Sequence, residues 1–349
     1  MRAADGKAWF PPIRRSRDEL PSFIGSWIRD SIWGWNRRDL ERALKGTKGL
    51  RINATMTTAI DSDVWQIQSR PLGQGLEALR HGVNGPLGAT LTAANLFVGR
   101  LDYRHLFEAW HRAKLRYTTT RHVANWFATQ GLSVDGVLPI YSRPTIFRST
   151  TSPSRSYVLV YVGKETDTTA VRMLLETRLP AILFGSKSVG WVMKALKLDR
   201  YPNARMLGRV TEEELRDLYS NASFTAFPFT EEPFGLVPVE SMACGTPVLT
   251  YAMQGPGESV IDQKTGWLVR TEEELVRRAI VIFQDGYPPE IVQACLDRAR
   301  AFSLDSACSN WNKLLTSVAA GQTGQMSESE TTKSREDSAL SVPLRTPRA

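Results

Sequence analysis

Two glutamates, Glu232 and Glu240, lie eight positions apart in the segment EPFGLVPVESMACGTP of this 349-residue chain. Carboxylates accept hydrogen bonds from neutral hydroxyl groups, such as those of a sugar or a ribose. Between them, the backbone amides of 235–237 are expected at the start of a helix, where unpaired N–H groups favour a phosphate. Both features suit a single ligand that carries hydroxyls and a diphosphate. The segment therefore predicts binding of a nucleoside diphosphate sugar.

Local signals in the same segment predict the elements that position these groups. Pro233 and Gly235 indicate a loop, and Pro238 fits the first turn of a helix, where the missing amide hydrogen costs nothing. Gly245 is expected to end that helix in the left-handed conformation, and Pro247 prevents its continuation. The predicted order of strand, loop, short helix and strand places the start of the helix at the carboxyl end of a sheet.

The C-terminal half alternates apolar strands with helical segments. This pattern is typical of a parallel sheet covered by helices on both faces, in which ligands bind beyond the carboxyl ends of the strands. The expected strands are 157–163, 181–185, 204–208, 223–229 and 246–251. The expected helices include 211–222, a helix capped by Thr271, and a last helix at 304–318.

The N-terminal half is harder to interpret. Its expected strands are 50–56, 63–69, 89–99 and 134–141, with helical segments at 106–117 and 121–130. Residues 1–50 contain four tryptophans, and apolar side chains at 24, 27, 28 and 32 follow helical spacing. This face either packs on its own domain or contacts a membrane or lipid acceptor. The first interpretation is favoured.

Composition limits the class of protein. Hydrophobic residues make up 42% and charged residues 23%, as in a soluble globular protein, and three cysteines without CxxC spacing argue against disulfides and zinc. No apolar run suggests a signal sequence or a membrane helix. Residues 1–150 carry 22 Lys and Arg against 12 Asp and Glu. We expect a cytoplasmic protein, with peripheral membrane contact as an alternative, and no nucleic-acid partner because no recognition motif accompanies the charge.

The Glu-x7-Glu motif and its flanks resemble the retaining GT-B glycosyltransferases of family 4, also called group 1. The resemblance is strong over 157–315, where GRVTEEELRDLYSNASFTAFPF precedes the motif, GPGESVIDQKTGWLV follows it and FSLDSACSNWNKLL matches the last helix. It is weaker over 117–147. It implies an α/β protein with two Rossmann-like domains facing each other across a cleft, the N-terminal one short or diverged.

The resemblance also implies roles for matching residues. Glu232 would contact hydroxyls of the transferred sugar and support an oxocarbenium-like centre, and Glu240 would hold the ribose hydroxyls. No metal or cofactor is implied, because fixed donors and basic side chains stabilise the leaving group of a UDP- or GDP-sugar. The other implied positions are Phe234, Gly235 and Leu236 at the diphosphate, Arg209 and Val210 at the base, and Gly163 and Lys164 after the first strand of that domain.

Three features depart from the family pattern. Lys164 can take the place of the first expected basic residue, but the second has only a distant candidate, Lys187. Residues 1–50 lack the usual apolar strand and glycine-rich loop. The N-domain loop that often supplies a histidine has Asn95, which leaves His81 as the best remaining candidate.

The predicted function is transfer of a sugar, with retention of configuration, to a hydroxyl of a glycan or a lipid-linked acceptor. Two alternatives stay open: a catalytically weakened paralogue acting as a binding or regulatory subunit, and a sugar-nucleotide epimerase. The predicted organisation is an acceptor-side domain 1–146, a linker 147–156, a donor-binding domain 157–301, a C-terminal helix 302–318 and a disordered tail 319–349.

Overall fold

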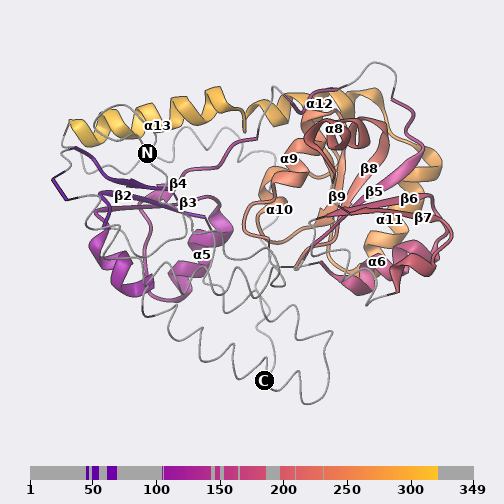
Figure 1. Ribbon diagram of the computed structural model, residues 1–349, viewed down its shortest axis with the longest axis horizontal. Helices are drawn as coiled ribbons and strands as arrows, with labels where there is room; N and C mark the ends of the chain where they lie inside the picture. Colours follow the sequence, from indigo (N-terminus) through magenta and orange to yellow (C-terminus); the bar gives the residue numbers. More distant parts are fainter. Residues whose placement is uncertain are drawn as a thin grey trace, which may run out of the picture.

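The computed structural model describes most of the chain between residues 45 and 320 (Figure 1). The described residues are 45–46, 49–54, 61–68, 104, 106–142, 146–149, 153–163, 166–185, 197–208, 210–230 and 232–320. Within them the strands form two separate sheets, and all strand pairs within each sheet are parallel. The predicted α/β class is confirmed. The predicted strand at 89–99, the interpretation of 1–44 and the predicted tail from 321 lie outside the described residues.

The first sheet has the order β1-β2-β3-β4. Its strands are Ile52–Asn53, Val64–Ile67, Leu115–Thr118 and Gly136–Val137, and helix α5 spans Arg121–Thr129. Trp65 and Ile67 of β2 pack against Val123 and Phe127 of α5 in one buried cluster. The sheet is therefore covered by α5 on one face.

The helix predicted at 106–117 is wrong at its C-terminal end. Residues 106–112 are helical, but Leu115–Thr118 form β3, paired with β2 in parallel. The side chain of Arg116 donates to the carbonyls of Trp110 and Ala113 at 2.9 and 2.8 Å, so it caps the end of that helix. Pairing with β2 and this cap together override the local helical pattern.

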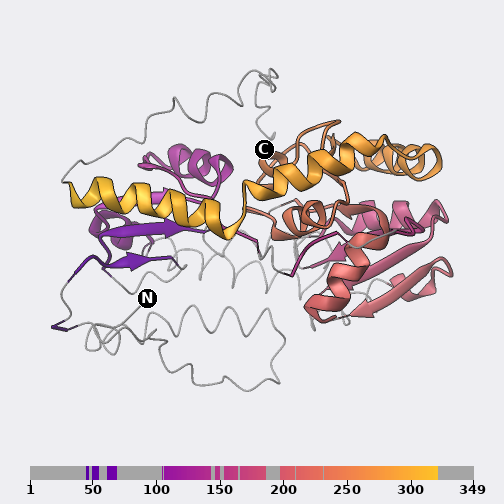
Figure 2. The ribbon, with the colours of Figure 1, turned by 90° about the horizontal axis from the view of Figure 1, so that it is seen from above.

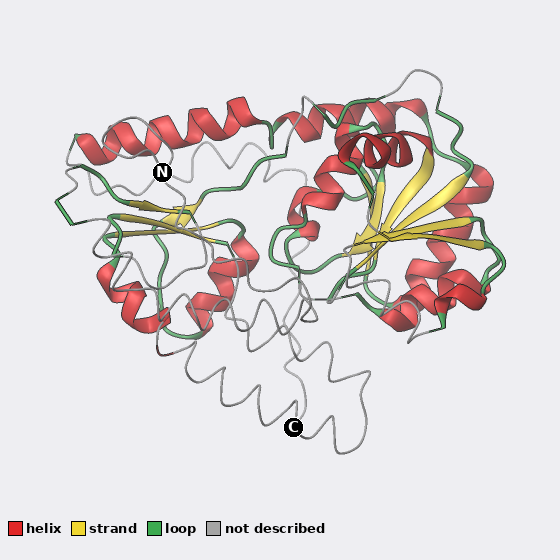
Figure 3. Ribbon diagram, viewed as in Figure 1, coloured by secondary structure: helices red, strands yellow, loops and turns green. Residues whose placement is uncertain are grey.

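The second sheet has the order β10-β9-β8-β5-β6-β7, with helices on both faces (Figure 3). Its strands are β5 Tyr157–Val162, β6 Ala181–Gly185, β7 Ala204–Gly208, β8 Ala222–Phe227, β9 Val248–Tyr251 and β10 Gly266–Val269. The helices are α6 Thr168–Glu176, η2 Leu198–Arg200, α8 Glu212–Asn221, α9 Leu236–Ala243, α10 Pro256–Ser259, α11 Glu272–Asp285 and α12 Pro289–Arg300. The five strands predicted in this half are confirmed. β5 ends one residue earlier than expected, β8 ends two residues earlier beside Pro228, and β9 begins two residues later beside Pro247.

Helix α13, Leu304–Ala319, follows the second domain in sequence but packs on the first sheet (Figures 1 and 2). Its Leu314 is 1% exposed and lies in a cluster with Val64, Tyr117 and Leu138. Backbone contact continues at the crossing, where the amide of Ser142 donates to the carbonyl of Phe302 at 2.9 Å. The C-terminal helix therefore completes the core of the N-terminal domain.

In the part of the chain that the structure describes, every helix is too short or too polar to cross a membrane. The domain bounds given above stay a prediction, since the two sheets fit them but do not define their limits.

Replacing Leu314 with alanine tests the packing of α13. We expect the free energy of unfolding to fall by about 2–5 kcal/mol, because a fully buried leucine is removed from a cluster that cannot collapse completely. Leu304→Ala, at a position of the same helix that is 46% exposed, should change it by less than about 0.5 kcal/mol. Urea denaturation measures both, and equal losses would contradict the assigned packing.

Candidate active site

The N-terminus of α9 is the structural centre of the site. Strand β8 ends at Phe227, and α9 begins at Leu236 after a left-handed N-cap at Gly235, whose φ is 81°. Amides in a first helical turn have no carbonyl partner within the helix. Among the described residues, no acceptor is hydrogen-bonded to the amides of Leu236 or Val237. This N-terminus lies at the carboxyl end of the sheet, as predicted, and can bind an anion.

Buried contacts fix helix α9 to the sheet. Val239 and Met242 are fully buried, and the hydroxyl of Ser241 lies 2.8 Å from the hydroxyl of Thr225 on β8. Gly245 takes a φ of 79° directly after the helix, which confirms the predicted left-handed ending. The position of the helix N-terminus is therefore set by buried contacts.

The amide, the carbonyl and the carboxylate of Glu232 all form hydrogen bonds. Its carboxylate accepts hydrogen bonds from the amides of Gly235 at 3.0 Å and Phe234 at 3.4 Å. Its amide donates to the side chain of Gln254 at 2.5 Å, and its carbonyl accepts from the amide of Gly255 at 3.0 Å. The carboxylate thus lies beside the entrance of α9 and occupies two of the three amides that the sequence assigned to a diphosphate.

Glu240 lies one turn further along α9 and is bound by a buried phenol. The hydroxyl of Tyr219, on α8, donates to a carboxylate oxygen of Glu240 at 3.2 Å. Burial, and then the charge of Glu240, raise the pKa of Tyr219 well above its usual value of 10, so the phenol stays protonated and remains a donor. Tyr219 therefore orients the second carboxylate of the motif.

Of the other predicted residues, Gly163 and Val210 are described by the structure and the rest are not. Gly163 follows β5, and a Cβ there would lie 3.0 Å from the ring of Phe229, a tight contact. Val210 is partly buried and packs against a hydrophobic cluster that contains Tyr219 of α8. Lys164 and Arg209 lie outside the described residues, as do Lys187, Asn95 and His81. The structure therefore brings together Glu232, Glu240 and the amides of α9.

The N-terminal domain reaches this loop through helix α5, which sequence reasoning did not assign to the site. The hydroxyl of Thr120, the N-cap of α5, donates to the carbonyl of Pro233 at 2.8 Å. The carboxylate of Glu258 on α10 accepts from the amides of Arg121 at 3.0 Å and His122 at 2.6 Å. The only sequence signal for these contacts was a threonine before a helical segment, and it gave no indication of the partner.

The similarity to known proteins agrees with this geometry. Residues 142–301 match the model of a family described as glycosyl transferases group 1. The match covers 160 of the 349 residues, and over these residues the chain is similar to that family. The predicted resemblance to retaining GT-B enzymes of family 4 is thereby confirmed.

Curated relatives match over limited stretches. One is a D-inositol 3-phosphate glycosyltransferase of Mycobacteroides abscessus, 33% identical over 117 residues, which are 32% of this chain and 26% of the relative. Another, from Salinispora arenicola, is 28% identical over 199 residues, or 50% of this chain and 44% of the relative. The chain thus spans between about a quarter and under half of the length of these two relatives.

Solved structures show the same fold over more of the chain. Sucrose-phosphate synthase from Thermosynechococcus elongatus has a TM-score of 0.59 and 18% identity, covering 92% of this chain and 83% of the synthase. The HepE protein of Anabaena, solved with UDP and glucose, has a TM-score of 0.53 and 16% identity, covering 73% and 78%. The two-domain GT-B fold is therefore confirmed.

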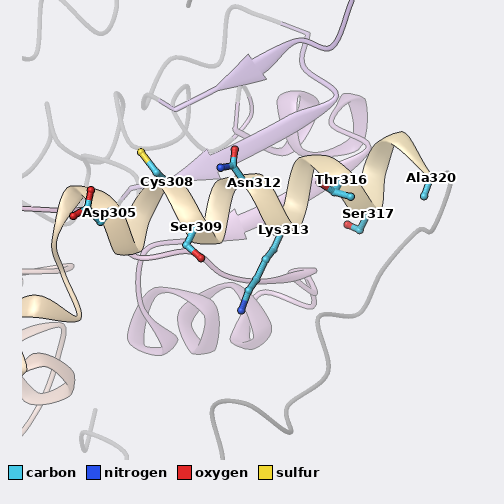
Figure 4. A pocket seen from close by; sticks show the side chains of 8 residues that line it. All are labelled: Asp305, Cys308, Ser309, Asn312, Lys313, Thr316, Ser317 and Ala320. Atoms are coloured by element: carbon cyan, nitrogen blue, oxygen red, sulfur yellow. The ribbon is translucent and has the colours of Figure 1, made fainter.

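A hollow lies along one side of α13 (Figure 4). Its lining comes from this helix and its C-terminal end, and it contains Asp305, Cys308, Ser309, Asn312, Lys313, Thr316, Ser317 and Ala320. None of the lining residues belongs to the motif at 232–247.

Replacing Gly235 with alanine tests the left-handed cap. A Cβ at Gly235 would lie 2.8 Å from Pro256 Cγ, whereas at Gly131, whose φ is 74°, it would meet nothing within 4 Å. We expect Gly131→Ala to cost about 1–2 kcal/mol through backbone strain alone. Gly235→Ala should cost more, because the loop at α10 must also move. Urea denaturation measures both, and equal costs would show that the contact with Pro256 is not tight.

Glu258 gives the contact between the domains a pH dependence. Burial raises the pKa of its carboxyl above the usual 4.5, and the amides of Arg121 and His122 offset this only in part. The native protein therefore retains a proton that the unfolded chain releases as the pH rises above 4.5, so stability contributed by this group is lost through that window.

We expect the free energy of unfolding of the parent chain to fall relative to that of Glu258→Gln as the pH rises from 4.5 through the native pKa of Glu258. Urea denaturation between pH 4 and pH 8 measures the difference. Glu290→Gln, at an exposed position of α12, is the matched control. If the free energy of unfolding of the parent chain does not fall relative to that of Glu258→Gln as the pH rises, the raised pKa is contradicted.

Proposed function

We propose that this chain transfers a sugar from a nucleoside diphosphate sugar to an acceptor hydroxyl, with retention of configuration and without a metal ion. The observation that supports this most directly is the N-terminus of α9, which presents unpaired amides between two carboxylates at the carboxyl end of a parallel sheet. The match of residues 142–301 to the group 1 family supports the same reaction class.

The donor is proposed to bind with its diphosphate at the amides of Leu236 and Val237, and to take over those of Phe234 and Gly235 from the Glu232 carboxylate. Charge that develops on the leaving diphosphate is stabilised by fixed N–H donors and the helix dipole, and removing one such donor typically costs a few kcal/mol of transition-state stabilisation. Lys164 and Arg209, which follow β5 and β7 in the sequence, add positive charge and a base contact in this proposal. The ribose hydroxyls bind Glu240.

Glu232 is proposed to act on the transferred sugar. Its carboxylate accepts from the amides of Phe234 and Gly235. A donor that brings phosphate oxygens to this N-terminus competes for these amides, and the carboxylate then turns to the sugar hydroxyls and to the positive charge developing at the anomeric carbon. Glu232 and the diphosphate thus share one set of donors in succession.

A metal ion has no part in this proposal. No group of three or more His, Cys, Asp or Glu side chains in the described portion of the chain is placed to hold one. Metal independence stays a prediction, and transfer in the presence of a chelator tests it. Retention is tested by the anomeric configuration of the product, read by NMR, and an inverted product would overturn it.

UDP-glucose is the first donor to test, because HepE, which shares the fold, was solved with UDP and glucose. The acceptor is proposed to be a glycan or lipid-linked hydroxyl that binds the basic N-terminal half. The family match begins at residue 142, so it carries information on the donor side only.

Two glutamine substitutions test the separate roles proposed for Glu232 and Glu240. Glu232→Gln should lower kcat by about 100-fold or more with little change in the affinity for UDP, because the lost charge acts mainly in the transition state. Glu240→Gln should weaken UDP binding by about tenfold or more, because a charge-assisted hydrogen bond contributes about 1.5–3 kcal/mol. Glu290→Gln should change neither.

Calorimetry with UDP and a transfer assay with labelled nucleotide sugars measure these effects. Binding of UDP without transfer of any donor would favour a binding or regulatory subunit. No binding of any nucleotide, or an unchanged rate in Glu232→Gln, would refute the proposed enzyme.

A further inference from the structure

Gln254 is a buried polar residue in a backbone conformation that side chains rarely adopt. It lies between β9 and α10, its φ is 64°, and it is 5% exposed. The left-handed region is unfavourable for residues with a Cβ and persists where the surroundings enforce it. A glycine would adopt this backbone without strain.

The side chain of Gln254 joins the two ends of the segment that leads to Glu232. Its Oε1 accepts from the amide of Glu232 at 2.5 Å, and its Nε2 donates to the carbonyl of Phe229. The partners fix the orientation of the carboxamide, because one group requires an acceptor and the other a donor. A single side chain thus satisfies two backbone groups three residues apart.

The neighbouring Gly255 completes this contact on the other side of Glu232. Its amide donates to the carbonyl of Glu232 at 3.0 Å. A Cβ on Gly255 would lie 2.3 Å from the carbonyl oxygen of Pro233, so the two loops touch backbone to backbone. Residues 254 and 255 therefore hold both peptide groups of Glu232.

We propose that Gln254 is a positioning residue for Glu232, an inference that rests on the transferase function proposed above. Fixing the peptide groups of Glu232 limits where its carboxylate can go when a donor displaces it from the amides of Phe234 and Gly235. Because the diphosphate and ribose contacts come from α9 itself, loss of Gln254 affects the chemical step and leaves nucleotide binding in place.

Two substitutions separate the hydrogen-bonded bridge from the backbone strain. Gln254→Met keeps the volume and the strain but removes both hydrogen bonds, and Gln254→Gly removes the bonds and relieves the strain. Gln263→Gly is the matched control. Gln263 has a φ of 59° but is exposed, and it lies before β10, at the amino end of the sheet.

We expect both Gln254 variants to lower kcat at least tenfold, with the Kd for UDP within threefold of the parent value. In Gln263→Gly, kcat and the Kd for UDP should each stay within twofold of the parent value. Hydrogen–deuterium exchange followed by mass spectrometry gives a readout that requires no activity. The peptide covering 229–235 should exchange at least tenfold faster in both Gln254 variants and at the parent rate in Gln263→Gly.

Unchanged exchange in that peptide, or an unchanged kcat in the Gln254 variants of an active parent, overturns the role of Gln254 and leaves the transferase proposal intact. A drop in kcat confined to Gln254→Gly also overturns it, because the backbone and not the bridge would then matter. A parent chain that turns over no donor overturns the transferase proposal, and with it the catalytic part of this inference.

Discussion

The rest of the site depends on how the loop from Glu232 to Gly235 is held before α9. Gly235 turns the chain into the helix through a left-handed conformation, and the carboxylate of Glu232 closes the loop by accepting from the amides of Gly235 and Phe234. From outside the loop, Gln254 and Gly255 bind the peptide groups of Glu232. The N-terminal domain adds one more contact, from Thr120 to the carbonyl of Pro233. A loop with so many backbone partners presents its groups in a fixed geometry, which is what electrostatic stabilisation of a leaving group requires.

The same loop also contacts the N-terminal domain. Thr120 caps α5 and at the same time contacts the motif loop, and Glu258 accepts from the first amides of α5. These contacts between the domains lie directly beside the carboxylate that is proposed to act on the sugar.

Much of the donor-binding domain could be predicted from local signals. Thr211 forms a capping box at the start of α8, Thr271 caps α11, and Gly245 ends α9, all as their neighbours in sequence indicate. Contacts between distant segments could not be predicted. Leu115–Thr118 became a strand because β2 lies beside it and Arg116 caps the preceding helix, and neither is visible in the helical spacing of the segment. Thr120 and Pro233 are 113 positions apart, and no residue type at either position indicates the other.

The central claim is that α9 binds the diphosphate of the donor between Glu232 and Glu240. A crystal structure of the chain with saturating UDP tests it most directly. We expect phosphate oxygens within hydrogen-bonding distance of the amides of Leu236 and Val237, ribose hydroxyls on Glu240, and the Glu232 carboxylate released from the amides of Phe234 and Gly235. UDP bound elsewhere, or an α9 N-terminus without phosphate at saturating UDP, would contradict the account.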